Sequence, residues 1–169
     1  IHCRNYQPQY AFYAKQATGS ALSDASCDKL WRVICQFGTR HDFFCLNPLW
    51  WARGAADWVI GGPSFRRKRR HPTDLRVGDV VDAWRVIALR PERKLTLLLE
   101  MKLPGSGVLE FELVPDGDRH RVHATAYFHP AGVWGLLYWY PLVPFHLWIF
   151  KGMTREISRR AQLLEQGTR

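Results

Sequence analysis

The last third of the sequence contains the feature that most limits how this chain can fold. From Ala131 to Phe150 no residue carries a formal charge, and a run of about 20 apolar residues is long enough to span a membrane as a helix. However, Pro141, Pro144 and His146 lie inside this run. Interior prolines remove backbone donors and bend or interrupt a helix. A membrane span therefore competes with a helix that covers an apolar surface of the same protein.

The apolar residues of this region recur at spacings of three and four, which is typical of one face of a helix. The stripe runs beyond the charge-free segment and comprises Tyr138, Leu142, Phe145, Ile149, Met153, Ile157, Ala161 and Leu164. We therefore favour an amphipathic helix over a membrane span. Unbroken from residue 133 to 164, it would be about 48 Å long at 1.5 Å per residue. We expect it to start or kink near Pro141 to Pro144.

The segments before this helix alternate apolar and polar residues, as strands with one buried face do. The predicted strands are residues 13–23, 80–89, 95–103, 109–113 and 122–128, and two short helices are predicted at 30–37 and 53–61. Small residues share one face of the first strand (Ala17, Gly19 and Ala21), which permits another element to approach closely. This order predicts an α+β fold in which a curved antiparallel sheet grips a long C-terminal helix, with two short helices after the first strand.

The length of 169 residues fits one domain of ordinary size. We predict a leader at 1–12, a single domain at 13–165 and a tail at 166–169. The formal net charge of +9 favours anionic partners. The four cysteines lack zinc-site spacing and are interpreted as free thiols in a reducing compartment, which favours a cytoplasmic location, with membrane association as the alternative.

Several short motifs resemble an uncharacterised bacterial family whose members are often fused behind NAD(P)-binding short-chain reductase-like domains. They are residues 50–54 (Trp-Trp-Ala-Arg-Gly), 61–62, 69–70, 78–86, 100–102, 104–105, 128–130 and 138–146. The order of elements resembles the helix-grip, START-like (SRPBCC) superfamily that includes Bet v 1, which implies a cavity between sheet and helix. The resemblance also implies a reductase-like NAD(P)-binding protein as a candidate partner. This chain has no Gly-x-Gly-x-x-Gly loop of its own, so we expect no cofactor.

Three polar residues are candidates for a site inside such a cavity. Alternation along the predicted strand places Asp82 on the same face as Trp84. A carboxylate facing a cavity must be paired, protonated or functional. A histidine side chain ordinarily titrates near neutral pH, so we interpret His146 either as a proton donor or acceptor or as a core histidine bonded to a carbonyl. Tyr138 offers a phenol, although it belongs to the apolar stripe. With Arg53 and Trp84, these residues form the predicted ligand-binding set, and Asp82 and His146 are the candidate catalytic residues.

A basic run, Arg66 to Arg70, has three interpretations: a solvated edge strand, a patch for a membrane or nucleic acid, and a clamp for an acidic ligand. Strand geometry would point its members to both faces, which disfavours nucleic acid. The histidines show no metal-binding spacing, so no metal site is expected. Glu100, Glu110 and Glu112 are predicted on the solvent side of their strands, which disfavours a catalytic carboxylate pair.

These features support three hypotheses about function. The first is binding of a hydrophobic or amphipathic small molecule, lipid-like or aromatic, in a cavity of a few hundred Å³, the low end for small-molecule sites. The second is an enzyme of cyclase, hydratase or isomerase type that uses Asp82 and His146. The third is peripheral membrane attachment through the apolar helix and the cationic surface.

Overall fold

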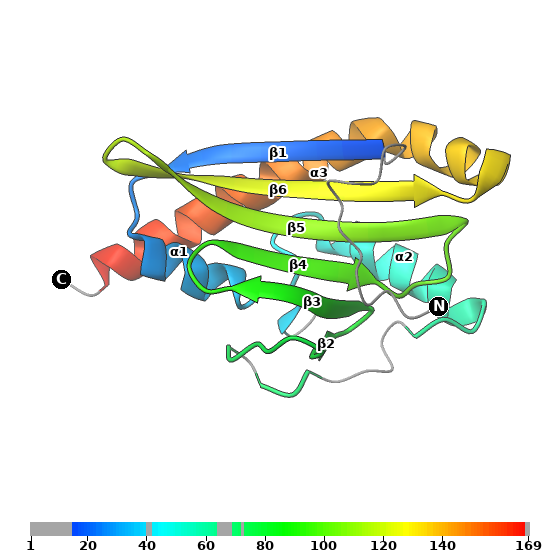
Figure 1. The fold of residues 1–169 in the computed structure, drawn as a ribbon, viewed down its shortest axis with the longest axis horizontal. Coiled ribbons are helices and arrows are strands. Elements are labelled where there is room, and N and C mark those ends of the chain that lie inside the picture. Colours follow the sequence, from blue (N-terminus) through cyan, green and yellow to red (C-terminus); the bar gives the residue numbers. More distant parts are fainter. Residues whose placement is uncertain (1–14, 40–41, 64–68, 72, 168–169) are drawn as a thin grey trace.

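The computed structural model describes residues 15–39, 42–63, 69–71 and 73–167. Its centre is a six-stranded antiparallel sheet, in the order β1-β6-β5-β4-β3-β2, with one long helix lying across one face (Figure 1). The elements are β1 (Lys15–Ser23), α1 (Cys27–Ile34), α2 (Asn47–Val59), β2 (Val80–Val81), β3 (Trp84–Arg90), β4 (Lys94–Leu99), β5 (Gly105–Asp116), β6 (Arg119–Pro130) and α3 (Gly132–Gln166). The predicted fold class, a curved sheet gripping a C-terminal helix, is confirmed. The predicted leader, residues 1–12, lies outside the described residues.

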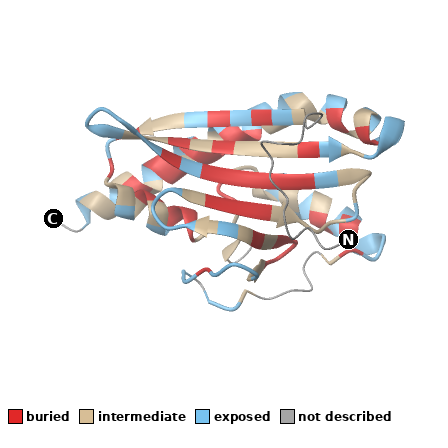
Figure 2. Cartoon of the chain, in the orientation of Figure 1, coloured by how far each residue is buried: buried red, intermediate tan, exposed pale blue. Residues whose placement is uncertain are grey.

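The helix side of the sheet carries the core. Residues paired across the strands in register place large apolar side chains side by side, such as Leu97 of β4 opposite Leu109 of β5, and both are fully buried. Buried side chains of α3, Met153 and Ile157, complete the core from the other side. Figure 2 shows the buried residues on the central strands and along α3. Burial of this apolar surface is what holds the helix against the sheet.

The small-residue face of β1 meets α3 directly, as the sequence predicts. A methyl group added at Gly19 would overlap the backbone of Phe150 and Lys151. Only glycine, which has no Cβ, allows the two backbones to come this close. At the other end of α3, the hydroxyl of Ser26 donates a hydrogen bond of 2.7 Å to the carboxylate of Glu165. Ser26, the N-cap residue of α1, therefore ties α1 to the C-terminal end of α3.

The expected start of α3 near Pro141 to Pro144 is wrong, because the helix begins at Gly132 and stays helical through both prolines. Both prolines lie on the exposed side. The carbonyls that lose a helical donor are those of Leu137 and Tyr140, whose residues are also exposed, so water can replace the missing bonds. The predicted stripe is buried from Ile149 to Ala161, but Phe145 is 50% exposed.

Among the other boundaries that differ from the sequence-based expectation, two affect the candidate site. α2 begins at Asn47, not near Arg53, and Pro48 lies in its first turn, where a missing N–H costs nothing. The predicted single strand 80–89 is a pair, β2 and β3, in which Val81 lies opposite Trp84. Asp82 has a left-handed backbone, φ 52°, and forms the turn between them. Asp82 therefore does not share a strand face with Trp84 as predicted.

The prediction that the strand glutamates face solvent is only partly right. Glu112 is exposed, but Glu110 is buried. Its carboxylate accepts a hydrogen bond from the hydroxyl of Thr96 at 3.2 Å and pairs with Lys94 at 3.0 Å. A buried carboxylate with these partners has a structural explanation.

Candidate functional site

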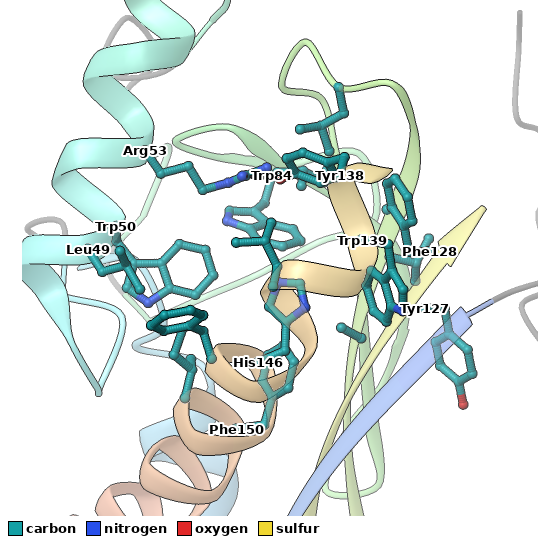
Figure 3. Close-up of a pocket in the computed structure, with 18 residues that line it drawn as sticks. Leu49, Trp50, Arg53, Trp84, Tyr127, Phe128, Tyr138, Trp139, His146 and Phe150 are labelled. Carbon is teal, nitrogen blue, oxygen red and sulfur yellow. Dashed lines mark hydrogen bonds between the residues drawn. The ribbon is translucent and has the colours of Figure 1, made fainter. Parts of the chain in front are cut away.

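A cavity of about 150 Å³ lies between the sheet and the first half of α3, with α2 forming one wall. Of the 18 residues that line it, three come from α2 (Leu49, Trp50 and Arg53), and the others come mainly from β3 to β6 and α3 (Figure 3). The predicted cavity is therefore present between sheet and helix. Its volume is smaller than the few hundred Å³ expected, because aromatic rings occupy much of the space.

The walls of the cavity are almost entirely apolar. Trp139 of α3 stacks on Phe128 of β6, with ring centroids 5.3 Å apart and an interplanar angle of 4°. Trp50 of α2 meets Trp84 of β3 edge-on at 6.2 Å. Two small residues of the sheet, Gly107 and Ala126, also line the cavity. Larger side chains at these two positions would fill the space, so their small size is what leaves it open.

One polar contact bridges the cavity. The guanidinium of Arg53, on α2, donates a hydrogen bond to the hydroxyl of Tyr138, on α3, and its carbon lies 5.6 Å from the centre of the Tyr138 ring. Figure 3 shows Arg53 extending from α2 toward Tyr138. Among the described residues, no carboxylate forms an ion pair with Arg53. A half-buried cation thus faces an apolar cavity with only a phenol as its side-chain partner.

His146 lies near the middle of the lining side chains (Figure 3). Its imidazole packs against Trp139, at 4.9 Å, and Phe150, at 5.8 Å. The Nδ1 atom is buried and has no hydrogen-bond partner among the described residues, so the predicted bond of a core histidine to a carbonyl is not seen at this nitrogen. Burial, and then the positive charge of Arg53, lowers the pKa of His146 to about 4. The imidazole is therefore neutral at pH 7, with one nitrogen free for a ligand.

Of the predicted ligand-binding residues, Arg53, Trp84, Tyr138 and His146 all line the cavity. Asp82 does not, because the turn between β2 and β3 holds it outside the lining. Its own burial, at 6% exposure, is a feature of that turn. Asp82 and His146 therefore do not share the lining of this cavity, which the hypothesis of a catalytic pair would need.

Sequence reasoning placed Arg53 of α2 at the site but missed Leu49 and Trp50 of the same helix. Leu49, Trp50 and Arg53 all line the cavity, and their spacing of three and four residues is that of one helix face. This spacing was not recognised because the predicted start of α2 was too late, after Pro48. Tyr127 also contributes to the lining, but its side chain points away from the cavity (Figure 3).

The described part of the basic run is structural. Arg69 donates hydrogen bonds to the backbone carbonyls of Cys35, Phe37 and His71, which holds the end of α1. Arg70 forms a two-pronged pair with Asp79, at 2.9–3.2 Å. These two arginines are therefore not available as a ligand clamp, and Arg66, Arg67 and Lys68 lie outside the described residues. Within the described ranges, no group of three metal-binding side chains occurs.

Solved structures share the fold at low sequence identity. A Nitrosospira multiformis protein matches with a TM-score of 0.54 and 14% identity, covering 90% of this chain and 99% of its own. A Thermus thermophilus protein has a TM-score of 0.51 and 9% identity, covering 89% of this chain and 99% of its own. Norcoclaurine synthase from Thalictrum flavum, in complex with dopamine and hydroxybenzaldehyde, has a TM-score of 0.54 and 16% identity, covering 94% of this chain and 91% of its own. At these identities the likeness establishes the helix-grip, Bet v 1-like fold.

No curated protein matches the sequence. A family model described as "Protein of unknown function (DUF2867)" matches residues 11–153. The match covers β1 through the first half of α3 and includes every residue that lines the cavity. The chain therefore belongs to the DUF2867 family and has the Bet v 1-like helix-grip fold.

Proposed function

We propose that this protein binds a small amphipathic molecule in the cavity between the sheet and α3. The observation that carries the proposal is an apolar cavity that contains a cationic group, Arg53, with no carboxylate partner among the described residues. Ligand sites are typically apolar pockets with a few polar groups that set orientation. Helix-grip proteins of this fold commonly bind hydrophobic ligands, which supports the same conclusion.

The size of the cavity limits the ligand. An apolar cavity of about 150 Å³ holds a body the size of one aromatic ring. A long lipid chain would need the cavity to widen, so an aromatic ligand fits better than a lipid-like one. The solved structure of norcoclaurine synthase contains dopamine and hydroxybenzaldehyde, two single-ring compounds, and this agrees with the proposed size without extending that protein's reaction to this chain.

The polar groups suggest what the ligand carries beside its ring. A guanidinium matches a carboxylate in both charge and geometry, and Arg53 is held near the cavity by Tyr138. The free Nδ1 of His146 adds one hydrogen-bonding position deeper among the rings. An aromatic acid is the ligand class that satisfies Arg53, Tyr138 and His146 together, with its anionic group at Arg53. Enzymatic proton transfer by Asp82 and His146 is not part of the proposal, since Asp82 does not line the cavity.

The test compares three single-ring probes by isothermal titration calorimetry: phenylacetate, benzyl alcohol and toluene. We expect phenylacetate to bind most tightly. Removing the cation in Arg53→Met should weaken phenylacetate about 10-fold or more, since a charged hydrogen bond contributes about 1.5–3 kcal/mol. The same variant should leave toluene binding unchanged. Arg90→Met is the matched control, because Arg90 is an exposed arginine of β3 that does not line the cavity.

A second variant tests the location of the ligand. Ala126→Leu should fill the cavity and abolish binding of all three probes, while Ala88→Leu, on an exposed position of β3, should not. If wild-type protein binds none of the probes, or if Ala126→Leu binds them unchanged, the proposal is wrong. Native mass spectrometry of gently purified protein would show directly whether a ligand of this class co-purifies. The reductase-like partner stays a prediction.

A further inference from the structure

The first half of α3 exposes large apolar side chains to an unusual degree. Val133, Trp134, Leu137, Tyr140, Phe145, Leu147 and Trp148 are between 47% and 77% exposed, and we call these seven residues the α3 apolar face. At 100° per residue they occupy less than half of the helix circumference. The opposite side of the same turns holds Trp139 and Phe150, which are buried against the sheet. The helix is therefore apolar on both sides here, but only one side is covered.

α2 exposes apolar side chains as well. Leu49, Trp51, Trp58 and Val59 are 41% to 76% exposed. Leu49 lines the cavity, as does Phe145 of the α3 apolar face. At 100° per residue, however, Trp51 and Trp58 lie on the side of α2 opposite Leu49. The interaction surface is therefore the α3 apolar face itself, because contiguous exposed apolar surface marks an interaction site in proteins.

The exposed charges that α2 and α3 carry near this surface have one sign. Along the outward side of α3, the apolar face is followed by Lys151 and Arg155, both exposed, and no described carboxylate forms an ion pair with either one. The first acidic residue of α3 is Glu156, and the one acidic residue of α2, Asp57, is only 4% exposed. The exposed charges of both helices up to residue 155 are thus all positive.

We propose that the α3 apolar face docks this protein onto an anionic lipid bilayer. Tryptophan and tyrosine side chains favour the membrane–water interface, and basic side chains next to them attract anionic headgroups. A helix with apolar aromatic turns followed by basic turns on one side matches both requirements. A second copy of the chain fits less well, because a symmetric contact would bring two positive surfaces together.

The helix lies on the bilayer in this proposal and does not cross it. α3 is the one helix within the described residues that is long and apolar enough to span a membrane, with 22% of its most apolar window buried. However, insertion of α3 into the bilayer would remove Trp139, Ile149 and Phe150 from the core that they share with the sheet. Docking keeps those contacts and covers the exposed side only.

The test is co-sedimentation of the full chain with phosphatidylcholine vesicles, with and without a minor fraction of phosphatidylglycerol, at low and physiological salt. We expect binding to the anionic vesicles, weakened several-fold by salt, and little binding to the neutral ones. A blue shift of tryptophan fluorescence and quenching by brominated lipid should accompany binding. Failure of the wild-type protein to bind anionic vesicles even at low salt would overturn the proposal.

Matched variants separate the two contributions. Leu137→Glu combined with Trp148→Glu should lower vesicle binding at least 10-fold, and Lys151→Glu combined with Arg155→Glu should lower it several-fold. Leu163→Glu is the control, because Leu163 is 52% exposed on the same helix but lies beyond the basic turns. Equal loss in this control would overturn the proposal. So would a dimer in light scattering that Leu137→Glu dissociates, because the face would then be a protein interface.

Docking does not depend on the proposed ligand. Neither Leu137 nor Trp148 lines the cavity, so the Leu137→Glu and Trp148→Glu variant should still bind phenylacetate in the absence of vesicles. Loss of vesicle binding with phenylacetate binding retained would support docking through this face. Absence of phenylacetate binding in the wild type, with vesicle binding intact, would overturn the proposed ligand and leave docking in place.

Discussion

Gly19 of β1 lies directly against the backbone of Phe150 in α3, with no space for a side chain between them. At this contact the backbones of the sheet and the helix lie against each other, and Phe150 is at the same time a lining residue of the cavity. The position of Gly19 therefore sets how deeply α3 sits on the sheet next to the cavity. The fold and the candidate site depend on the same backbone contact.

Gly19→Ala should destabilise the protein by about 1–3 kcal/mol, because the new methyl group must push two backbones apart. Chemical denaturation followed by circular dichroism measures this change. Gly107→Ala is the control, since Gly107 is also a buried strand glycine but its nearest neighbour would be the side chain of Leu99 at 3.4 Å. The control should be within about 1 kcal/mol of wild type. Equal destabilisation of both variants would contradict the importance of the Gly19 contact.

Acid should destabilise the protein through His146. Its native pKa is about 4, against the ordinary 6.5, because burial and Arg53 disfavour the charged imidazole. Above pH 6.5 the imidazole is neutral in both the folded and the unfolded chain, so its burial takes nothing from the free energy of unfolding there. As the pH falls toward 4, only the unfolded chain gains the proton, and the native state loses up to about 3 kcal/mol.

His146→Phe isolates this effect from all other titrating groups. The free energy of unfolding of the wild type, minus that of the variant, should fall by about 2 kcal/mol between about pH 7 and pH 4.5. Carboxylates that titrate in the same range contribute equally to both proteins and cancel. A difference that is flat with pH would show that His146 is not held neutral in the native state.

Asp57 anchors the end of α2, which forms one wall of the cavity. Its carboxylate accepts a hydrogen bond of 2.8 Å from the backbone N–H of Lys102, and it is 4% exposed. Asp57→Ala should therefore cost about 1–3 kcal/mol, since the buried N–H loses its acceptor. Asp57→Asn keeps an oxygen acceptor and should cost less. The order of urea midpoints, wild type above Asn above Ala, is the expected result, and equal midpoints for the two variants would contradict it.

Arg69 should contribute more to stability than its neighbour Arg70. Its guanidinium donates hydrogen bonds to the carbonyls of Cys35 and Phe37 at the end of α1. A lysine side chain is shorter and ends in a single ammonium group, so it cannot reach several carbonyls at once. Arg69→Lys should cost about 1–3 kcal/mol in thermal or chemical unfolding. Arg70→Lys, at an exposed ion pair with Asp79, should change stability much less. The reverse order would show that the basic run is held by its surface pairs.

The sequence was sufficient to predict the sheet, because alternation along strands such as β1 and β6 reports which face is buried. It was less reliable where the chain changes direction. The turn at Asp82 depends on a left-handed backbone, and alternation continues across such a turn as if the strand were unbroken. This is why Asp82 was wrongly placed beside Trp84, whereas Trp84, on a regular strand, was placed correctly at the cavity.

The candidate site also shows which features local sequence patterns predict and which features only packing decides. Periodicity alone identified α3 as an amphipathic helix with buried Met153 and Ile157, because the period of a helix is a property of local backbone geometry. Which of Phe145 and His146 faces inward was decided by packing: the ring of His146 fits between Trp139 and Phe150, and Phe145 is left half-exposed. The meeting of Arg53 and Tyr138 likewise joins two helices far apart in the chain. The sequence by itself determined the elements, and only the tertiary structure decided the cavity, because its size and polar groups depend on contacts between residues distant in sequence.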